Sequence, residues 1–271
     1  MKLAFTTLGC LDWNLDQIIS AAKEYGFQGI DFRGYMDELN IYKLPEFSTE
    51  VEVTKAKIKD AGLAVTCFSA SIRLIAPNDE MRVEFLNEII EYAKLAKIFG
   101  TKYIRVFGGG WLNFSREEAI AEAIRNMELL LDATEEYGVV FAIETHDEWG
   151  DTTTMKDFLE KMDNPRVKVV WDINHPYRGG ETPEKTYENI GKWVAYTHWK
   201  DSKYAPENDR GYEECIPGIG DLPLKRFYDL LEMADYDGWH TLEWERKWHP
   251  ELEPPEFAFP AFVKSMKEIS K

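Results

Sequence analysis

Cysteine is scarce in this sequence, which contains only Cys10, Cys67 and Cys215 in 271 residues. Their number is odd, they lie far apart and no CxxC pair occurs, a pattern that argues against a disulfide framework and against a thiolate zinc site. We therefore expect free thiols and a reducing, cytoplasmic location.

Long apolar runs and basic stretches are also lacking. No run approaches the roughly 20 apolar residues that span a bilayer, and the opening MKLAFTTLGCLDW holds too brief an apolar stretch for a secretion signal. The 32 Lys and Arg residues are outnumbered by 49 Asp and Glu residues, which gives a net charge of -17, whereas nucleic-acid binders usually carry a basic stripe. Neither a membrane nor a nucleic acid is expected as a partner.

Two nucleotide-binding motifs are absent as well, because neither GxGxxG nor GxxxxGK[ST] occurs. The sequence does contain a regular alternation of short β-rich runs with amphipathic stretches, among them a long helical pattern over 116–138. Helical stretches end at Gly26, Gly62, Gly100 and Gly138, as expected of helix C-caps before a strand. The predicted strands cover residues 2–7, 29–33, 64–72, 103–109, 139–146, 167–175, 194–201 and 239–245.

Strand-helix pairs that repeat about every 30 residues predict a closed parallel barrel, which typically takes about 250 residues. The fold class is therefore α/β, a (β/α)8 TIM barrel, with residues 1–271 as a single domain. The longest irregular segment, residues 201–221, follows the seventh strand. Loops of that length in compact domains are usually binding loops or lids, so we expect it to form a mobile cover over the open end.

Ionisable residues fall at the ends of four successive predicted strands: Glu144 in IETH, Asp172 in WDINH, His198 in YTHWKD and Glu243 in TLEWE. In this architecture the carboxyl ends of the strands form the catalytic face. Each residue alone has a structural explanation, such as a helix cap, a core histidine or an ion pair. Together, three carboxylates converging in one mouth would repel one another strongly without a cation. The four residues are therefore predicted to bind one divalent metal ion.

Three carboxylates and one imidazole form a mostly hard ligand set. Such a set suits Mn²⁺, Mg²⁺ or Co²⁺ and admits Zn²⁺. We favour Mn²⁺.

The strand-end segments resemble those of a known family, the xylose-isomerase-like barrels of the sugar isomerase and epimerase superfamily. This superfamily includes ketose 3-epimerases, hydroxypyruvate isomerase and inosose dehydratase. The resemblance extends over nearly the whole chain and is carried by the segments KEYGFQGIDFR, IETH, WDINH, THWKD, PGIGDLP and YDGWHTLEWE. It implies that the same four residues bind the metal and that His175 contacts substrate. Gly150 stands where the epimerases carry a second glutamate.

The ligand set implies a chemistry. A divalent ion that chelates the carbonyl and hydroxyl of a ketose acts as a Lewis acid and stabilises the enediolate left by proton removal. Glu144 and Glu243, on strands five and eight, are predicted catalytic residues, one removing a proton and the other returning it. The leading hypothesis is an isomerase or epimerase of a small keto-sugar or polyol. If the intermediate expels a β-hydroxyl, the same machinery is a dehydratase of an inosose-like hydroxy-ketone.

Further side chains are candidates for substrate binding. His146 and Lys200 lie beside predicted ligands, although His146 also suits a role in orienting them. Arg246 is suited to hold a polar substrate group or to neutralise Glu245, and Trp111 is suited to form a wall for a sugar ring.

Two other function classes rank lower. An endonuclease-IV-like nuclease would need several more histidines than the five present. A non-catalytic sugar sensor gains little from two opposed carboxylates. A homo-oligomer is compatible with the sequence.

Overall fold

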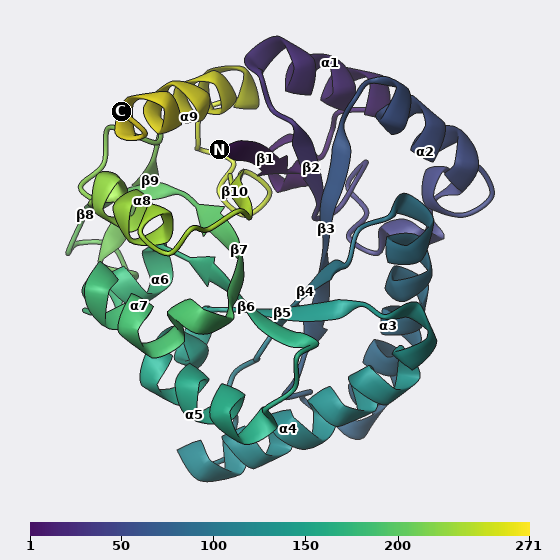
Figure 1. Ribbon diagram of the computed structural model, residues 1–271, viewed down its shortest axis with the longest axis vertical. Coiled ribbons are helices and arrows are strands. Elements are labelled where there is room, and N and C mark those ends of the chain that lie inside the picture. Colours follow the sequence, from purple (N-terminus) through teal and green to yellow (C-terminus); the bar gives the residue numbers. More distant parts are fainter.

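A computed structural model describes residues 1–271 and contains a closed barrel of eight parallel strands (Figure 1). Around the barrel the order is β1-β10-β7-β6-β5-β4-β3-β2. The predicted single-domain TIM barrel is thereby confirmed. The strands are β1 Lys2–Thr6, β2 Gly29–Phe32, β3 Ala64–Arg73, β4 Tyr103–Phe107, β5 Val140–Glu144, β6 Val167–Asp172, β7 Val194–Trp199 and β10 Trp239–Leu242.

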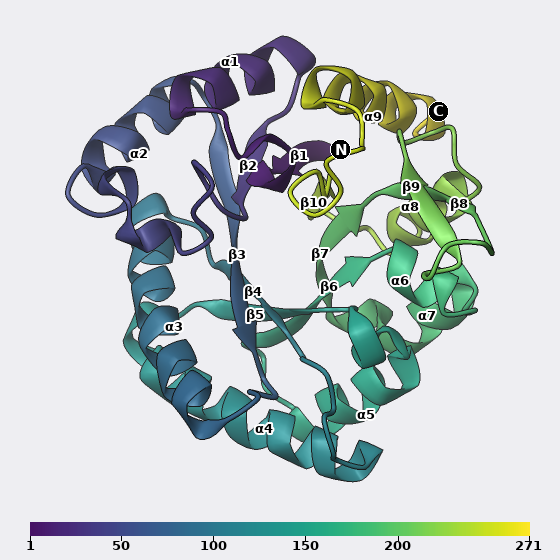
Figure 2. The same ribbon diagram turned by 180° about the vertical axis from the view of Figure 1, so that it is seen from behind.

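Helices surround the barrel in a ring (Figures 1 and 2). Local sequence sets their ends: the side chains of Asn14 and Ser115 form capping boxes at two helix starts, and Gly26 and Gly100 end two helices with φ of 91° and 74°. Gly62 also has a positive φ, as predicted for a helix end, whereas Gly138 ends the short 3-10 helix Glu135–Tyr137 rather than the long helix predicted before it. The helices are α1 Leu15–Tyr25, α2 Val51–Asp60, α3 Asp79–Phe99, α4 Arg116–Ala133, α5 Thr152–Met162, α6 Asn174–Arg178, α7 Pro183–Ile190, α8 Leu224–Glu232 and α9 Pro255–Ile269.

The hydrophobic core lies between the strands and the helix ring. Phe5 of β1, for example, packs against Phe259 of α9 at 4.6 Å between ring centroids. Inside the barrel, by contrast, several buried residues are charged, including Asp31, Arg105 and Lys200. Burying charges costs free energy unless they are paired, so these residues mark the interior as a functional site.

Several predicted elements extend beyond their ends in the structure. Strand β6 ends at Asp172 rather than at residue 175, because the Asp172 carboxylate caps the start of α6 by accepting the Asn174 N–H at 2.8 Å. His175 therefore lies on a helix. The long helix predicted over 116–138 ends at Ala133, where the Thr134 hydroxyl donates to the Leu130 carbonyl.

The segment 201–221 was predicted to be irregular, and this prediction was wrong. Its first part forms the antiparallel hairpin of β8 (Asp201–Tyr204) and β9 (Tyr212–Cys215), seen beside α6 and α7 in Figure 2. The Asp201 carboxylate fixes the chain that follows, because one oxygen accepts the N–H groups of Gly218 and Gly220 at 2.9 Å each. The hairpin strands are mainly polar, which hides them from a search for apolar alternation.

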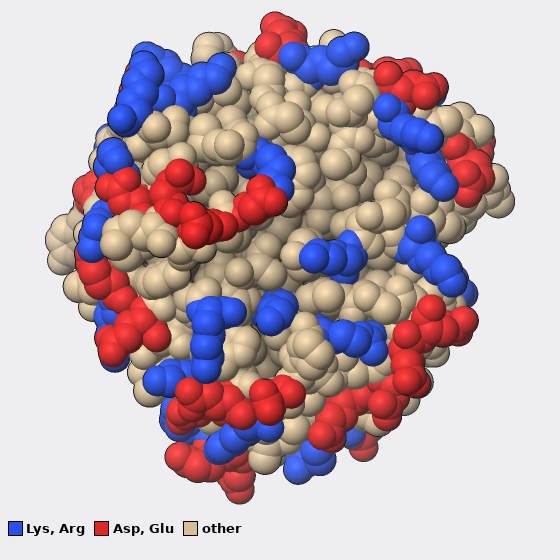
Figure 3. Space-filling view, viewed as in Figure 1, with Lys and Arg blue, Asp and Glu red and all other residues tan.

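Acidic and basic side chains are interspersed on the face drawn in Figure 3, with acidic groups gathered mainly at the rim. No continuous basic stripe crosses this face. None of the helices has the length and apolar character that a membrane crossing requires.

Candidate metal centre

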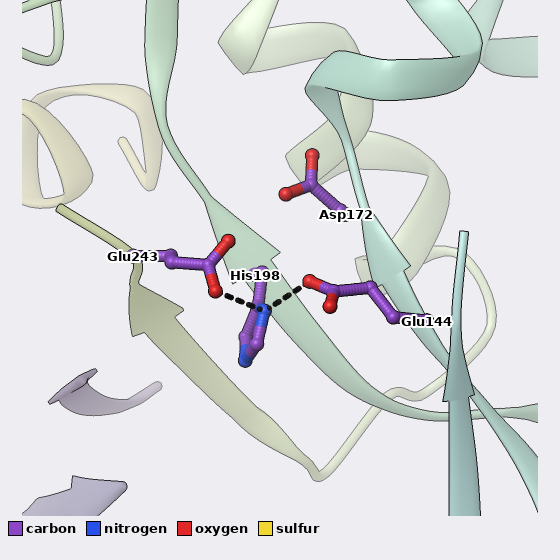
Figure 4. Close-up of side chains that lie close together, drawn as sticks. All are labelled: Glu144, Asp172, His198 and Glu243. Atoms are coloured by element: carbon purple, nitrogen blue, oxygen red, sulfur yellow. Dashed lines mark hydrogen bonds and ion pairs between the residues drawn. The ribbon is translucent and has the colours of Figure 1, made fainter. Parts of the chain in front are cut away.

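The four predicted ligands meet inside the barrel. Glu144 ends β5, Asp172 ends β6, His198 lies in β7 and Glu243 directly follows β10. One potential ligand atom of each lies within 4.8 Å of those of the others, and all four residues are buried. Figure 4 shows both glutamates directed at the imidazole, with Asp172 beside them. Strands that are neighbours in the barrel therefore bring together the residues that the sequence pattern selected.

The His198 imidazole is held from both sides. Its Nδ1 lies 2.7 Å from Glu144 Oε1 and 3.3 Å from Glu243 Oε1. Its Nε2 lies 3.3 Å from Asp31 Oδ2 on β2. Because β2 and β7 are not neighbours in the barrel, this last contact crosses the interior. A carboxylate on the far nitrogen is the usual way in which a metal-binding histidine is oriented.

Two buried cations neutralise the carboxylates. Lys200 Nζ lies 3.0 Å from Asp172, 2.8 Å from Glu243 and 2.5 Å from Glu245. Arg105 Nε lies 3.4 Å from Glu144 Oε2. Lys200, a predicted substrate-binding residue, thus contacts two of the four proposed ligands.

These neighbours shift the acidities of the site. Burial and the Glu243 carboxylate act to raise the pKa of Glu144, but Arg105 and His198 outweigh them and lower it to about 2. Burial likewise opposes ionisation of Glu243, yet Lys200 and His198 hold its pKa well below the ordinary value. Both glutamates are therefore ionised at neutral pH, which is the form that binds a metal.

The residues fit a divalent ion. Glu144 Oε2 and Asp172 Oδ2 are buried and accept no hydrogen bond, and their nearest cations are Arg105, at 3.4 Å from the first, and Lys200, at 3.0 Å from the second. Buried oxygens without a hydrogen bond are rare in native proteins, and an ion is one of their explanations. Three carboxylates and an imidazole offer the oxygen and nitrogen donors that Mn²⁺, Mg²⁺ or Zn²⁺ takes. The cluster is thus able to hold one metal ion, and its donor set leaves the identity of the metal open.

Two further predicted residues, His146 and His175, lie together. Their rings are 4.4 Å apart, edge to face, and the Phe107 ring lies 5.0 Å from His146. Their side chains are 31% and 20% exposed, in contrast to the nearly inaccessible ligands. His146 Nδ1 lies 3.0 Å from Asp147 Oδ1. Because His146 follows Glu144 by two residues, the pair borders the metal centre.

Arg246 and Trp111 do not contact the four ligands. The Arg246 Nε donates to the Leu252 carbonyl at 3.4 Å, and the residue lines a cavity of about 250 Å³ with Leu8 and Asp37. Trp111 lies in the loop after β4, where its indole N–H is buried without a partner. Substrate binding by either residue stays a prediction.

Sequence reasoning missed Asp31 and Arg105. A signal was present, because each is a charged residue within an otherwise apolar run, GIDF and YIRVF. In a strand buried on both faces such a residue must point either into the barrel or into the core, and a barrel interior with a site is the less costly place for it.

A scan against protein-family models matches residues 19–268 to the xylose isomerase-like TIM barrel. This chain belongs to that family. The match covers every barrel strand except β1 and includes all four proposed metal ligands, in agreement with the resemblance seen in the sequence.

Two curated relatives of the chain are dehydratases. It is 26% identical to a 3-dehydroshikimate dehydratase of Bacillus anthracis over 84% of each chain. It is 24% identical to an inosose dehydratase of Lacticaseibacillus casei, where the match covers 44% of this chain and 45% of the relative. The second match therefore spans less than half the length of that relative.

Solved structures share the fold. A structure of IOLI protein with a bound zinc atom superposes with a TM-score of 0.82 at 19% identity, over 99% of this chain and 98% of that one. A 3-keto-D-glucoside 4-epimerase of E. coli has a TM-score of 0.77 at 17% identity, over 100% and 99%. At these identities the likeness shows the fold alone.

Proposed function

We propose that this protein is a metal-dependent dehydratase that removes water from a cyclic β-hydroxy ketone, with 3-dehydroshikimate as the first candidate substrate. The observation that carries the proposal is the accessible pair His146 and His175 beside a buried, charge-paired set of ligands. The similarity to a 3-dehydroshikimate dehydratase over 84% of both chains supports it.

Glu144, Asp172, His198 and Glu243 would hold the metal. When bound, a divalent ion supplies Lewis acidity toward a carbonyl oxygen, which makes the neighbouring C–H bond more acidic. The remaining steps belong to side chains of this chain. Lys200 and Arg105 hold the ligand carboxylates in place, and Asp31 fixes the imidazole of His198.

His146 is the proposed proton acceptor. Its ring is accessible and Asp147 holds one nitrogen, which leaves the other ring nitrogen free to take the proton from the carbon beside the ketone. The C–O bond to the β-hydroxyl then breaks, the carbon–carbon double bond forms, and the leaving hydroxide departs as water after it receives a proton. The adjacent His175 is placed to donate or relay that proton.

Isomerisation or epimerisation is the second candidate. It would use Glu144 and Glu243 as bases on opposite faces of the substrate, as the sequence suggests. Both carboxylates are paired with cations and lie at the His198 imidazole, which makes them better ligands than proton carriers. Gly150, where the epimerases carry a second glutamate, lies against His175, with 3.7 Å between its ideal Cβ position and the His175 Cβ.

A product analysis separates the two. The Mn²⁺-loaded protein is incubated in D₂O with 3-dehydroshikimate, an inosose and a panel of ketoses. We expect a product lighter than substrate by one water, with the absorbance of an aromatic ring from 3-dehydroshikimate. A product of unchanged composition that gains deuterium would instead establish the epimerase. His146→Gln should abolish the loss of water and leave metal binding intact.

A further inference from the structure

Arg33 is a buried cation without a partner. It follows β2 directly and is 5% exposed, yet its guanidinium makes no hydrogen bond and no ion pair of 4 Å or less, and its Nη1 is fully buried. Buried arginines are almost always paired, because an unpaired buried charge destabilises the folded protein. In this respect Arg33 differs from Arg105, which contacts both Glu144 and the Ala70 carbonyl.

The guanidinium belongs to the space around the metal centre. Arg33 follows Asp31 by two residues and lies one residue beyond the end of β2, where continuation of the strand's alternation would put the two side chains on the same side. The Asp31 side chain points across the interior to His198. Burial and Arg105 lower the pKa of Arg33 to about 10, while Tyr92 of α3, Glu243 and Glu144 act to raise it. Arg33 is therefore charged at neutral pH and lies within the electrostatic influence of both α3 and the candidate metal centre.

A further carboxylate that interacts electrostatically with Arg33 is Glu88 of α3, but the two side chains form no ion pair of 4 Å or less. Glu88 Oε1 is also buried without a hydrogen-bond partner. Burial raises the pKa of Glu88 to about 7 even though Arg33 acts to lower it. The fork of N–H donors on Arg33 thus remains free for a group that enters from outside.

We propose that Arg33 binds a carboxylate on the substrate and so makes the site selective for acidic ring ketones over neutral ones. This inference rests on the proposed function. It favours 3-dehydroshikimate over an inosose as substrate, because 3-dehydroshikimate carries a carboxylate and an inosose does not. A planar guanidinium binds a carboxylate through two parallel N–H···O bonds, which gives both charge and orientation. Arg33 is a specificity-determining residue of the site.

The test uses the full-length, Mn²⁺-loaded protein and two probes that lack a ketone, shikimate and its neutral methyl ester. Calorimetric titration should show that wild type binds shikimate about 10- to 100-fold more tightly than the ester. Arg33→Met should remove this preference by weakening shikimate alone, and Arg33→Lys should retain part of it. Equal binding of both probes by wild type, or a preference that survives in Arg33→Met, would overturn the proposal.

A structural role for Arg33 predicts a different result. If Arg33 served mainly to pair with Glu88, then Arg33→Met and Glu88→Gln would both lower the thermal midpoint of the unliganded protein. We expect neither to do so, since the two side chains form no ion pair with each other. A matched fall in both midpoints, with unchanged probe binding, would assign Arg33 to the scaffold and reject the proposal.

Failure of the proposed function has its own signature. Suppose that Arg33→Met loses the preference for shikimate but wild type does not turn over 3-dehydroshikimate. This result would retain the carboxylate site and reject the dehydratase. Turnover of an inosose by wild type, with no discrimination between the probes, would retain the dehydratase and reject the carboxylate site.

Discussion

Lys200 shows how single residues balance the charge inside the barrel. Its ammonium group is fully buried and lies within 3.0 Å of carboxylate oxygens of Asp172, Glu243 and Glu245. Burial alone would favour the neutral amine, but the three carboxylates outweigh it and raise the pKa of Lys200 well above the ordinary value. The lysine is therefore charged at neutral pH, and it is part of the scaffold of the candidate metal centre.

Replacement of this lysine should destabilise the protein in a metal-dependent way. Lys200→Met leaves two buried carboxylates, Asp172 and Glu243, and the partly exposed Glu245 without their shared cation. Removal of one partner from a buried ion pair typically costs about 3–5 kcal/mol. Because a divalent ion supplies positive charge at two of these carboxylates, added Mn²⁺ should restore much of the loss. Chemical unfolding with and without Mn²⁺ measures both effects.

Lys203→Met on β8 is the matched control, since Lys203 is exposed and forms no ion pair. Its unfolding curves should overlay those of wild type. A Lys200→Met protein as stable as wild type in chelator would mean that the carboxylates become protonated or solvated at little cost, against the view of Lys200 as their obligatory partner.

At the scale of elements, the β8-β9 hairpin connects to the barrel through Glu214. This residue of β9 lies close to Glu245 and His249, with one potential ligand atom of each within 4.8 Å of those of the others. Arg210 Nη1 is 3.3 Å from one Glu214 oxygen, while the other is buried without a partner. Burial and the Glu245 carboxylate raise the pKa of Glu214 to about 8. The hairpin thus packs at the open end of the barrel, and the Glu214 carboxyl is protonated at neutral pH and below.

This acid makes stability depend on pH. The Glu214 carboxyl has an ordinary pKa of 4.5 when unfolded and about 8 when folded, so between these values the folded protein binds one more proton. Stability should therefore fall as pH rises through this window, by up to about 1.4 kcal/mol per pH unit from this group. The amide in Glu214→Gln cannot ionise. When pH rises from 5.5 to 7.5, the free energy of unfolding of this variant should therefore fall by about 2 kcal/mol less than that of wild type. Urea unfolding at both pH values gives the comparison.

Glu213→Gln serves as the control, because Glu213 is the exposed neighbour on the same strand. It should follow wild type at both pH values. If Glu214→Gln also ran parallel to wild type, Glu214 would be ionised in the folded protein and the hairpin would be held in another way.

The contrast between hairpin and barrel shows how far sequence predicts structure here. Alternating β-rich and amphipathic runs, closed by residues such as Gly26 and Gly100, predict the barrel because its helices and strands bury apolar faces at regular spacing. Residues at strand ends predict the metal centre because parallel strands all end at one face. The roles of Asp31 and Arg33 were not predicted. Whether such a charged side chain finds a partner depends on strands that are distant in sequence, as with Asp31 and His198. The hairpin was missed because Asp201 hydrogen bonds, rather than apolar contacts, fix it.

For the molecule as a whole, the barrel positions ligands that only the closed fold brings together. Glu144 and Glu243 are separated by nearly a hundred residues in the chain, yet both lie within 3.3 Å of the same His198 nitrogen. An ion that binds this set binds the folded state and not the unfolded chain. Metal binding and global stability are therefore linked.

The last prediction follows from this linkage: Mn²⁺ should raise the thermal midpoint of the whole protein. A ligand present at about 100 times its dissociation constant adds about 2.7 kcal/mol to the folded state, and chelator should remove this increment together with any dehydratase activity. His198→Ala should abolish the increment by removing the nitrogen ligand.

Asp31→Asn keeps every ligand but loses the carboxylate that orients His198. It should therefore weaken metal affinity about 10- to 100-fold, and correspondingly more Mn²⁺ should be needed to reach the same thermal midpoint. Asp37→Asn, on an exposed loop side chain whose one ion pair is with Lys247, should respond to Mn²⁺ as wild type does. Midpoints that ignore Mn²⁺ in wild type would show that the buried carboxylates and cations form a structural network without a metal.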